Sequence, residues 1–235
     1  VCQWALGSCM WQLVLECHWA PRLPRGTWRE RAAAQLSRAY FDFVLWCRLR
    51  GLQCSHPPFT VCSMSMHQKT SWPYLKGKAA NTLTIAKWVL HLSRIRADRA
   101  PADMHKQLVA TMLWGFVEVF RICGAAGTWL SDAEARALDV AREASLQGYG
   151  ALAAEAAAAH PPRPMFRLVP KHHAWDEALR DAVGGGRNPG HHWCFGDEDF
   201  IGRVKRIAAG THGTSLSRRV LQRYMCRIFE DAEDA

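Results

Sequence analysis

Side chains that could bind a metal ion or act as acids and bases are concentrated in residues 188–203 of this 235-residue chain. The segment contains two adjacent histidines, one cysteine and three consecutive carboxylates: His191, His192, Cys194, Asp197, Glu198 and Asp199. Carboxylate oxygens suit Mg²⁺ and Mn²⁺, so Glu198, together with Asp197, is a candidate ligand of a divalent cation. The simpler interpretation is that these acids open a helix, where they accept hydrogen bonds from free amides and complement the helix dipole.

Histidines and a cysteine in the same part of the sequence raise the alternative of a zinc site. They are His172, His173, His191, His192 and His212, with Cys194. Zinc sites commonly show an H-E-x-x-H pattern or paired cysteines, and this region has neither. His172 shares a predicted helix face with Trp175 and Leu179, so we expect a buried, hydrogen-bonded core histidine at that position.

Basic side chains near the C-terminus are spaced as a phosphate-binding surface would require. Arg219, Arg223 and Arg227 recur every four residues, and Arg203, Lys205 and Arg206 cover the polar face of the preceding predicted helix. Such ridges contact nucleic-acid backbones with little sequence preference and strong salt dependence. A solvated helix face beside the acidic tail would have the same composition, and that alternative stays open.

The net charge of +9 is unevenly distributed along the chain. Residues 1–100 hold 14 Lys and Arg against 4 Asp and Glu, a net charge of +10; residues 101–162 carry −3, residues 163–229 carry +6, and the tail carries −4. Two basic blocks therefore flank an acidic middle. Such blocks suit a polyanion such as nucleic acid, although solvated arginines are the commoner reason for them.

Other kinds of chemistry find no support in the sequence. The nine cysteines include no C-x-x-C pair, so we expect free thiols that act as small apolar side chains in a reducing compartment. There is no nucleophile elbow, and the glycine-rich residues 184–190 lack the Lys-Ser/Thr ending of a phosphate loop, which favours a flexible turn. Residues 1–20 are apolar but lack a basic leader and contain Gln3, Gln12 and Glu16. They predict a buried or interface helix, and no membrane association is expected.

Helical periodicity dominates the rest of the chain. We predict helices over residues 27–50, 78–96, 102–123, 131–159, 171–183, 197–209 and 214–229. Ser131 and Glu134 have the spacing of a capping box. The only strand-like run is residues 59–64, which predicts a short hairpin or an extended connection. The fold class is therefore mainly α, an irregular multi-helix bundle with little or no sheet.

The expected organisation has three parts. They are an apolar N-terminal segment (1–26), a helical core (27–160) and a basic C-terminal helical unit with an acidic tail (161–235). In the helix over residues 27–50 we expect Leu36, Phe43 and Cys47 on the inner face, and Gln35 and Arg38 on the outer face.

One stretch of the C-terminal unit resembles a known family. Pro170-Lys171-His172-His173, a short helix, an Asn-Pro turn and then Trp193-Cys194-Phe195-Gly196-Asp197-Glu198-Asp199-Phe200 look like the C-terminal part of DDE-type transposases of large cut-and-paste DNA elements. The resemblance covers residues 165–229 and implies an RNase H-like core in which Glu198 is the last of three metal-binding carboxylates, with Mg²⁺ or Mn²⁺ as cofactor. The chain departs from that pattern because it has no earlier pair of aspartates on strand ends.

The resemblance and the charge distribution lead to one functional expectation and one alternative. The first is a mobile-element-derived nucleic-acid-binding protein, a degenerate transposase C-terminal region that is not active as this fragment. It would be intracellular, and nuclear if it binds DNA. Its other partners would be a second protein or the remaining segments of a longer parent chain. The alternative is a non-catalytic helical interaction or scaffold module.

Overall fold

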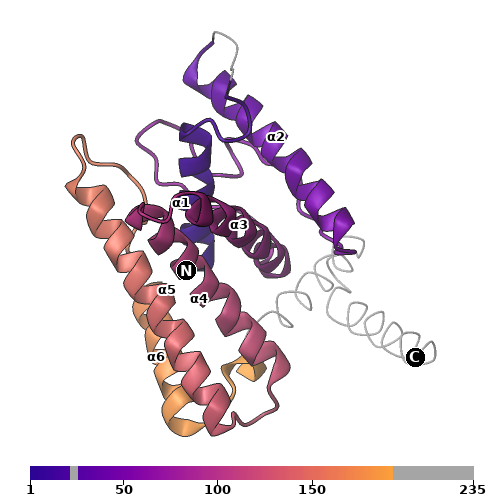
Figure 1. The fold of residues 1–235 in the computed structure, drawn as a ribbon, viewed down its shortest axis with the longest axis vertical. Helices are drawn as coiled ribbons and strands as arrows, with labels where there is room; N and C mark the ends of the chain where they lie inside the picture. The colour runs from indigo at the N-terminus through magenta and orange to yellow at the C-terminus, as the bar shows by residue number, and fades with distance from the viewer. Residues whose placement is uncertain (22–25, 193–235) are drawn as a thin grey trace, which may run out of the picture. The chain divides into compact units, whose positions relative to one another are not determined.

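The most apolar stretch of the sequence forms a helix that is covered on all sides. The computed structural model describes residues 1–21 and 26–192, apart from the side chains of His191 and His192. In α1, Cys2–Leu15, buried side chains such as Leu6, Met10 and Leu13 occur around the whole circumference. Such a helix must be enclosed, and α1 contacts α2, α3 and α4 (Figure 1). This confirms the predicted buried helix near the N-terminus.

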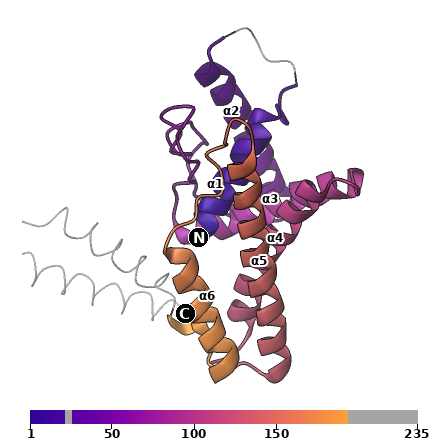
Figure 2. The same ribbon diagram turned by 90° about the vertical axis from the view of Figure 1, so that its left-hand side faces the viewer.

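Helices account for all the regular structure that the described residues contain. After α1 come α2 (Trp28–Leu49), α3 (Ala79–Arg99), α4 (Met104–Ala125), α5 (Asp132–Ala158), α6 (Lys171–Gly185) and the short 3-10 helix η1 (Pro189–His192). No strand occurs among these residues, which confirms the mainly α class. Residues 1–191 form one compact unit, in which α5 runs alongside both α4 and α6 (Figures 1 and 2).

Capping boxes set the starts of α5 and α2. At α5 the Ser131 hydroxyl accepts a hydrogen bond from the Glu134 amide (3.3 Å), and the Glu134 carboxylate accepts one from the Ser131 amide (2.8 Å), which confirms the predicted capping box. Thr27 and Glu30 form the same arrangement at the start of α2. The cap fixes Trp28 as the first helical residue of α2.

Glycines bring α4 and α5 unusually close together. A Cβ atom on Gly115 would lie 2.6 Å from both the Ala141 carbonyl oxygen and the Ser145 amide nitrogen on α5. A Cβ on Gly148 would lie 2.9 Å from the Met112 Cβ on α4. The two backbones therefore touch where no side chain separates them.

Helix α4 is long and apolar enough to cross a membrane by length and composition alone, and it is the only such helix in the described part of the chain. Half of its most apolar window is buried in this fold. The core helix of a soluble protein shows the same properties, so α4 is weak evidence for a membrane.

The inner face of α2 is as predicted, with one exception. Leu36, Phe43 and Cys47 are buried, but Gln35, which we expected to be exposed, is fully buried as well. Its side-chain oxygen accepts a hydrogen bond from the Trp19 amide (3.0 Å), and its nitrogen donates one to the Ala20 carbonyl (2.9 Å). The chain that leaves α1 passes over α2 at this point, and its buried backbone groups need polar partners. The prediction for Gln35 was wrong for this reason.

Residues 59–64 do not form a strand. The connection from α2 to α3 is irregular, and residues 61–65 make a turn closed by the amide of Met66 on the carbonyl of Val61 (2.9 Å). Thr60 and Ser63 reinforce it with reciprocal bonds from amide to hydroxyl (2.8 and 3.0 Å). The apolar side chains that suggested a strand, such as Phe59, instead fill the core.

The glycine-rich turn after α6 is anchored, contrary to the flexible turn we expected. Helix α6 ends at Gly186 in the left-handed conformation (φ 67°), as its glycine run predicted. The fully buried Asn188 then donates hydrogen bonds to the carbonyls of Cys123, Ala126 and Gly127 at 2.9 to 3.1 Å. These bonds satisfy carbonyls at the end of α4 and hold the turn against it.

Candidate anion-binding site

The site residues predicted from the sequence lie outside the described part of the chain. They are the candidate metal ligands Glu198 and Asp197 and the basic residues Arg203, Lys205, Arg206, Arg219, Arg223 and Arg227. Their roles therefore stay predictions.

The two histidines at the start of α6 do not share a ligand site. His172 is buried, as predicted, with its ring 4.3 Å from that of Tyr149 and its Nδ1 3.0 Å from the Val169 carbonyl oxygen. Burial lowers the pKa of His172. His173 is exposed and lies 3.1 Å from the Glu177 carboxylate. No group of three potential metal ligands occurs within residues 1–21 and 26–192.

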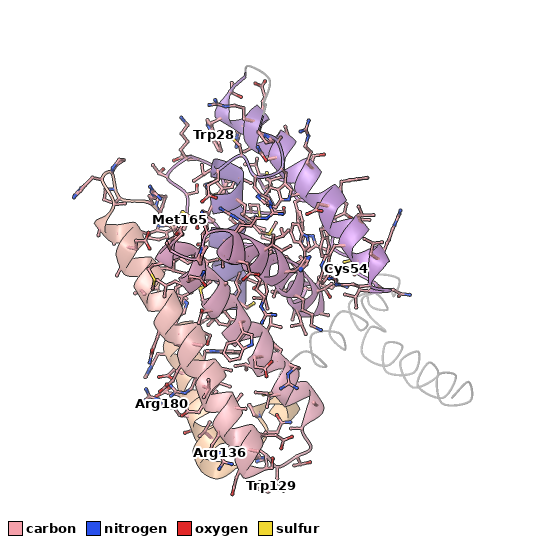
Figure 3. All side chains as sticks on the ribbon, viewed as in Figure 1. Trp28, Cys54, Trp129, Arg136, Met165 and Arg180 are labelled. Carbon is pink, nitrogen blue, oxygen red and sulfur yellow. The ribbon has the colours of Figure 1, made fainter. Side chains whose placement is uncertain are left out.

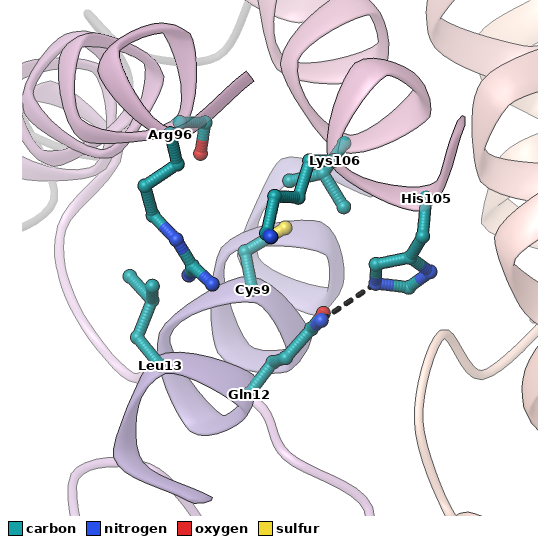
Figure 4. Close-up of a pocket in the computed structure, with 8 residues that line it drawn as sticks. Cys9, Gln12, Leu13, Arg96, His105 and Lys106 are labelled. Atoms are coloured by element: carbon teal, nitrogen blue, oxygen red, sulfur yellow. Dashed lines mark hydrogen bonds between the residues drawn. The ribbon is translucent and has the colours of Figure 1, made fainter. Parts of the chain in front are cut away.

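A polar cluster between α1, α3, α4 and α5 contains a thiol and an imidazole, so it is a candidate catalytic site (Figure 4). His105 bridges Gln12 on α1 (2.6 Å) and Glu155 on α5 (2.8 Å), while Arg96 pairs with Glu16. Figure 4 shows the contact between Gln12 and His105 beside Cys9.

Neither the space nor the thiol in this cluster suits catalysis. The cavity has a volume of about 20 Å³, which holds one water molecule and no substrate. Burial strongly raises the pKa of Cys9, so the thiol stays protonated, whereas a nucleophilic cysteine needs a lowered pKa. We therefore interpret the cluster as a structural network that ties α1 to α4 and α5.

A larger pocket opens between the end of α1, the start of α2 and the connection after α5. Its volume is about 730 Å³. The apolar part of its lining includes Trp11, Val14, Trp28 and Met165. Figure 3 shows Trp28 at the start of α2 and Met165 on the connection that follows α5. Segments far apart in the sequence therefore build one cavity.

Among the residues that the structure describes, the charged side chains that line this pocket are all cations. Arg31 comes from α2, Lys69 from the connection between α2 and α3, and Arg163 from the connection between α5 and α6. All three are exposed, and none makes an ion pair within the described residues. Three unpaired positive charges around one cavity create a positive potential that attracts anions.

Carboxylates on the neighbouring helix ends are already engaged. Glu16, at the end of α1, pairs with Arg96, and Glu30 accepts the hydrogen bond of the Thr27 amide in the cap of α2 (2.8 Å). Neither lines the pocket. These carboxylates therefore do not neutralise Arg31, Lys69 and Arg163, whose positive charge is available to an anionic ligand.

Local structure fixes each wall of the pocket. At the end of α1 the amides of Cys17 and His18 donate to the carbonyls of Val14 (3.1 Å) and Leu13 (3.0 Å), a Schellman motif with Cys17 in the left-handed conformation (φ 54°). This motif turns the chain at the pocket wall.

The two irregular walls are also held by hydrogen bonds. The Arg29 guanidinium donates to the His67 carbonyl (3.2 Å), which ties the segment that carries Lys69 to α2. The Arg163 amide donates to the Ala156 carbonyl at the end of α5 (2.9 Å). The three cations are therefore displayed by anchored segments.

The sequence did not reveal that these residues form one site. The surplus of positive charge over residues 1–100 was the available signal. Nothing in the sequence, however, shows that Lys69 and Arg163 fold back to the same place.

Comparisons with known proteins give no further guidance. No family model, no curated protein and no solved structure matches the chain. The functional assignment therefore has to rest on the geometry above, and the transposase resemblance stays a hypothesis.

Proposed function

We propose that the protein binds nucleic acid, and that the pocket between α1, α2 and the connection after α5 is part of the binding surface. The observation that supports the proposal is the set of three unpaired cations, Arg31, Lys69 and Arg163, around a cavity whose described lining residues include no carboxylate. Nucleic-acid affinity depends largely on such contacts to phosphates. The net charge of +10 over residues 1–100 supports the same partner.

The proposal concerns binding rather than strand cleavage. The described residues include no strand on which the first two aspartates of an RNase H-like core could stand. Origin from a mobile element is the part of the proposal that depends on residues 165–229 alone. An intracellular location, nuclear if the target is DNA, follows from the same proposal.

The direct test is a binding titration at two salt concentrations. A fluorescently labelled oligonucleotide of about 20 nucleotides, single-stranded or duplex, would be titrated with protein at about 50 mM and about 200 mM NaCl. We expect binding at the lower concentration and a steep loss at the higher one. Absence of binding at low salt, or affinity that salt does not change, would refute the proposal.

Metal binding at Glu198 is a separate proposal that rests on the family resemblance. Calorimetric titration of Mn²⁺ or Mg²⁺ into the wild-type protein and a Glu198→Gln variant tests it, with Asp197→Asn as the second variant. Identical heats for all proteins would exclude both carboxylates as ligands.

A second candidate function, a helical interaction or scaffold module, is favoured by an exposed apolar ridge on α2. Phe41, Leu45 and Leu49 follow at intervals of four residues and are 72%, 46% and 75% exposed. A contiguous exposed apolar patch often marks a protein-binding surface. Sedimentation of the wild-type protein against a Phe41→Gln, Leu49→Gln double variant tests self-association through this ridge, and equal behaviour of the two would count against it.

A further inference from the structure

The pocket geometry points to a site for an unpaired nucleotide within a single strand, with its base against Trp28 and phosphates of the strand near Arg31, Lys69 and Arg163. The protein accordingly prefers single-stranded over duplex nucleic acid. This inference rests on the proposed nucleic-acid binding and specifies the form of nucleic acid that the same site takes.

The size of the pocket suits a single nucleotide. A volume of about 730 Å³ lies within the range of pockets that enclose small organic ligands, about 300 to 1,000 Å³. One nucleotide fits such a space. A base pair inside a duplex does not, because its bases are stacked within the helix and only their edges are accessible from the grooves. An unpaired base can enter without that obstacle.

The aromatic part of the lining offers a surface for a base. Trp28 is half-buried, and its ring meets that of the buried Trp11 edge to face, with centroids 6.3 Å apart and an interplanar angle of 83°. The Arg29 guanidinium lies over the Trp28 ring, 5.8 Å from its centroid, and Trp28 still forms part of the pocket lining. A planar indole in a cationic pocket matches the way single-stranded nucleic acids are bound, in which bases stack on aromatic rings and phosphates contact Lys and Arg.

The arrangement of charge around the apolar lining matches a ligand with both anionic and planar parts. Arg31, Lys69 and Arg163 come from three different segments and are exposed, so phosphates bound by them leave the apolar part of the lining free for a base. A nucleotide has this combination of anionic and planar parts. An anionic fatty acid shares the charge but lacks the plane, and the paired indoles favour the base.

The test compares a single-stranded oligonucleotide with a duplex of the same length. Affinities for labelled oligothymidylate and for the duplex would be measured by fluorescence anisotropy with the full chain. We expect the wild type to bind the single strand about 10-fold more tightly. A Trp28→Leu variant, which keeps apolar bulk, should lose most of this preference with little change in duplex affinity.

Two further variants keep the result interpretable. Trp28→Phe retains an aromatic face and should restore most of the preference. Trp129→Leu alters a tryptophan that is 67% exposed and does not line the pocket, and it should behave as wild type (Figure 3). Thermal melting followed by circular dichroism would show that the variants are folded.

The outcomes separate this inference from the proposed function. Equal affinity of the wild type for single strand and duplex, or an unchanged preference in Trp28→Leu, would overturn the nucleotide pocket while leaving nucleic-acid binding intact. The inference would also be overturned if oleate quenched tryptophan fluorescence in the wild type but not in Trp28→Leu, while the oligonucleotide quenched neither protein. Absence of binding to either nucleic acid would refute the proposed function itself.

Discussion

Replacing Gly115 with alanine should force α4 and α5 apart. A Cβ at this position would lie 2.6 Å from the Ala141 carbonyl oxygen and from the Ser145 amide nitrogen, and 3.0 Å from the Ser145 Cα. All three are backbone atoms, so no side-chain rotation can relieve the contact. Ordinary van der Waals contact begins at 3.4 Å, so the helices must separate locally by about 0.8 Å, or the backbone must bend.

The expected loss follows from two opposing effects. Overpacking of a filled interior costs about 1 to 3 kcal/mol, and a clash with two rigid backbone groups belongs at the upper end. Alanine in place of glycine inside a helix returns about 1 kcal/mol. We therefore expect Gly115→Ala to lower the free energy of unfolding by about 2 kcal/mol.

Gly150→Ala is the matched control. Gly150 also lies inside a helix, α5, but a Cβ there would meet nothing within 4 Å. The Gly150→Ala substitution should raise the free energy of unfolding by about 0.5 to 1 kcal/mol, because only helix propensity changes. Urea unfolding followed by circular dichroism measures both variants. A Gly115→Ala protein as stable as Gly150→Ala would refute the close contact of α4 and α5.

Three further predictions concern stability, pH and thiol reactivity. Cys17→Gly should stabilise the protein by about 0.5 kcal/mol, seen as a higher melting temperature, because Cys17 occupies a left-handed conformation (φ 54°) that glycine adopts without strain. Lowering the pH from about 7.5 to about 5.5 should reduce the free energy of unfolding. His172 contributes to this loss, since its lowered pKa means that the unfolded chain binds the proton first, with a limiting slope of about 1.4 kcal/mol per pH unit. Alkylation at pH 8, mapped by mass spectrometry, should modify the exposed Cys62 early and the buried Cys9 only on unfolding.

Each of these predictions has its own control. Gly51→Ala makes the reverse change at the end of α2, where φ is 64° and nothing lies within 4 Å, and it should destabilise by about 1 kcal/mol. His172→Phe should flatten the pH dependence, and an unchanged slope would show that His172 does not titrate as described. Equal labelling rates for Cys62 and Cys9 in the folded protein would contradict the burial of Cys9.

Local signals were sufficient to predict the helices. A 3.6-residue apolar period and caps such as Ser131 and Gly186 act within a few residues of the helix they define, so they can be read from the sequence. The helix starts and ends predicted between residues 27 and 183 lie within a few residues of the observed ones.

Sequence-based predictions failed for residues whose conformation or burial depends on contacts with distant parts of the chain. For residues 59–64 the hairpin alternative was wrong, whereas a connection without a strand is what the described residues show, because apolar side chains such as Phe59 pack into the core. Gln35 is polar by type, yet the backbone of Trp19 and Ala20 needs its amide.

The candidate site depended on the same long-range information. Charge composition indicated an anionic partner, but the cavity exists only because the connection after α5 returns to α1 and α2. The aromatic part of the site could not be predicted for the same reason. Trp11 belongs to a buried helix and Trp28 to the start of another, and no local pattern shows that the two rings meet.

The central claim, that Arg31, Lys69 and Arg163 contact phosphates, is tested most directly by the salt dependence of binding. The comparison uses a variant with all three changed to Gln and a control with the exposed cations Lys87, Arg136 and Lys171, outside the pocket lining, changed to Gln. Each lost contact to a single strand lowers the slope of log affinity against log salt by about 0.7.

The pocket variant should therefore show a slope about 2 smaller in magnitude than the wild type. Between about 50 and 200 mM NaCl the wild type would then lose about 20-fold more affinity than the pocket variant does. The control variant should keep the wild-type slope. Equal slopes for the pocket variant and the wild type would contradict the claim that the pocket binds phosphate.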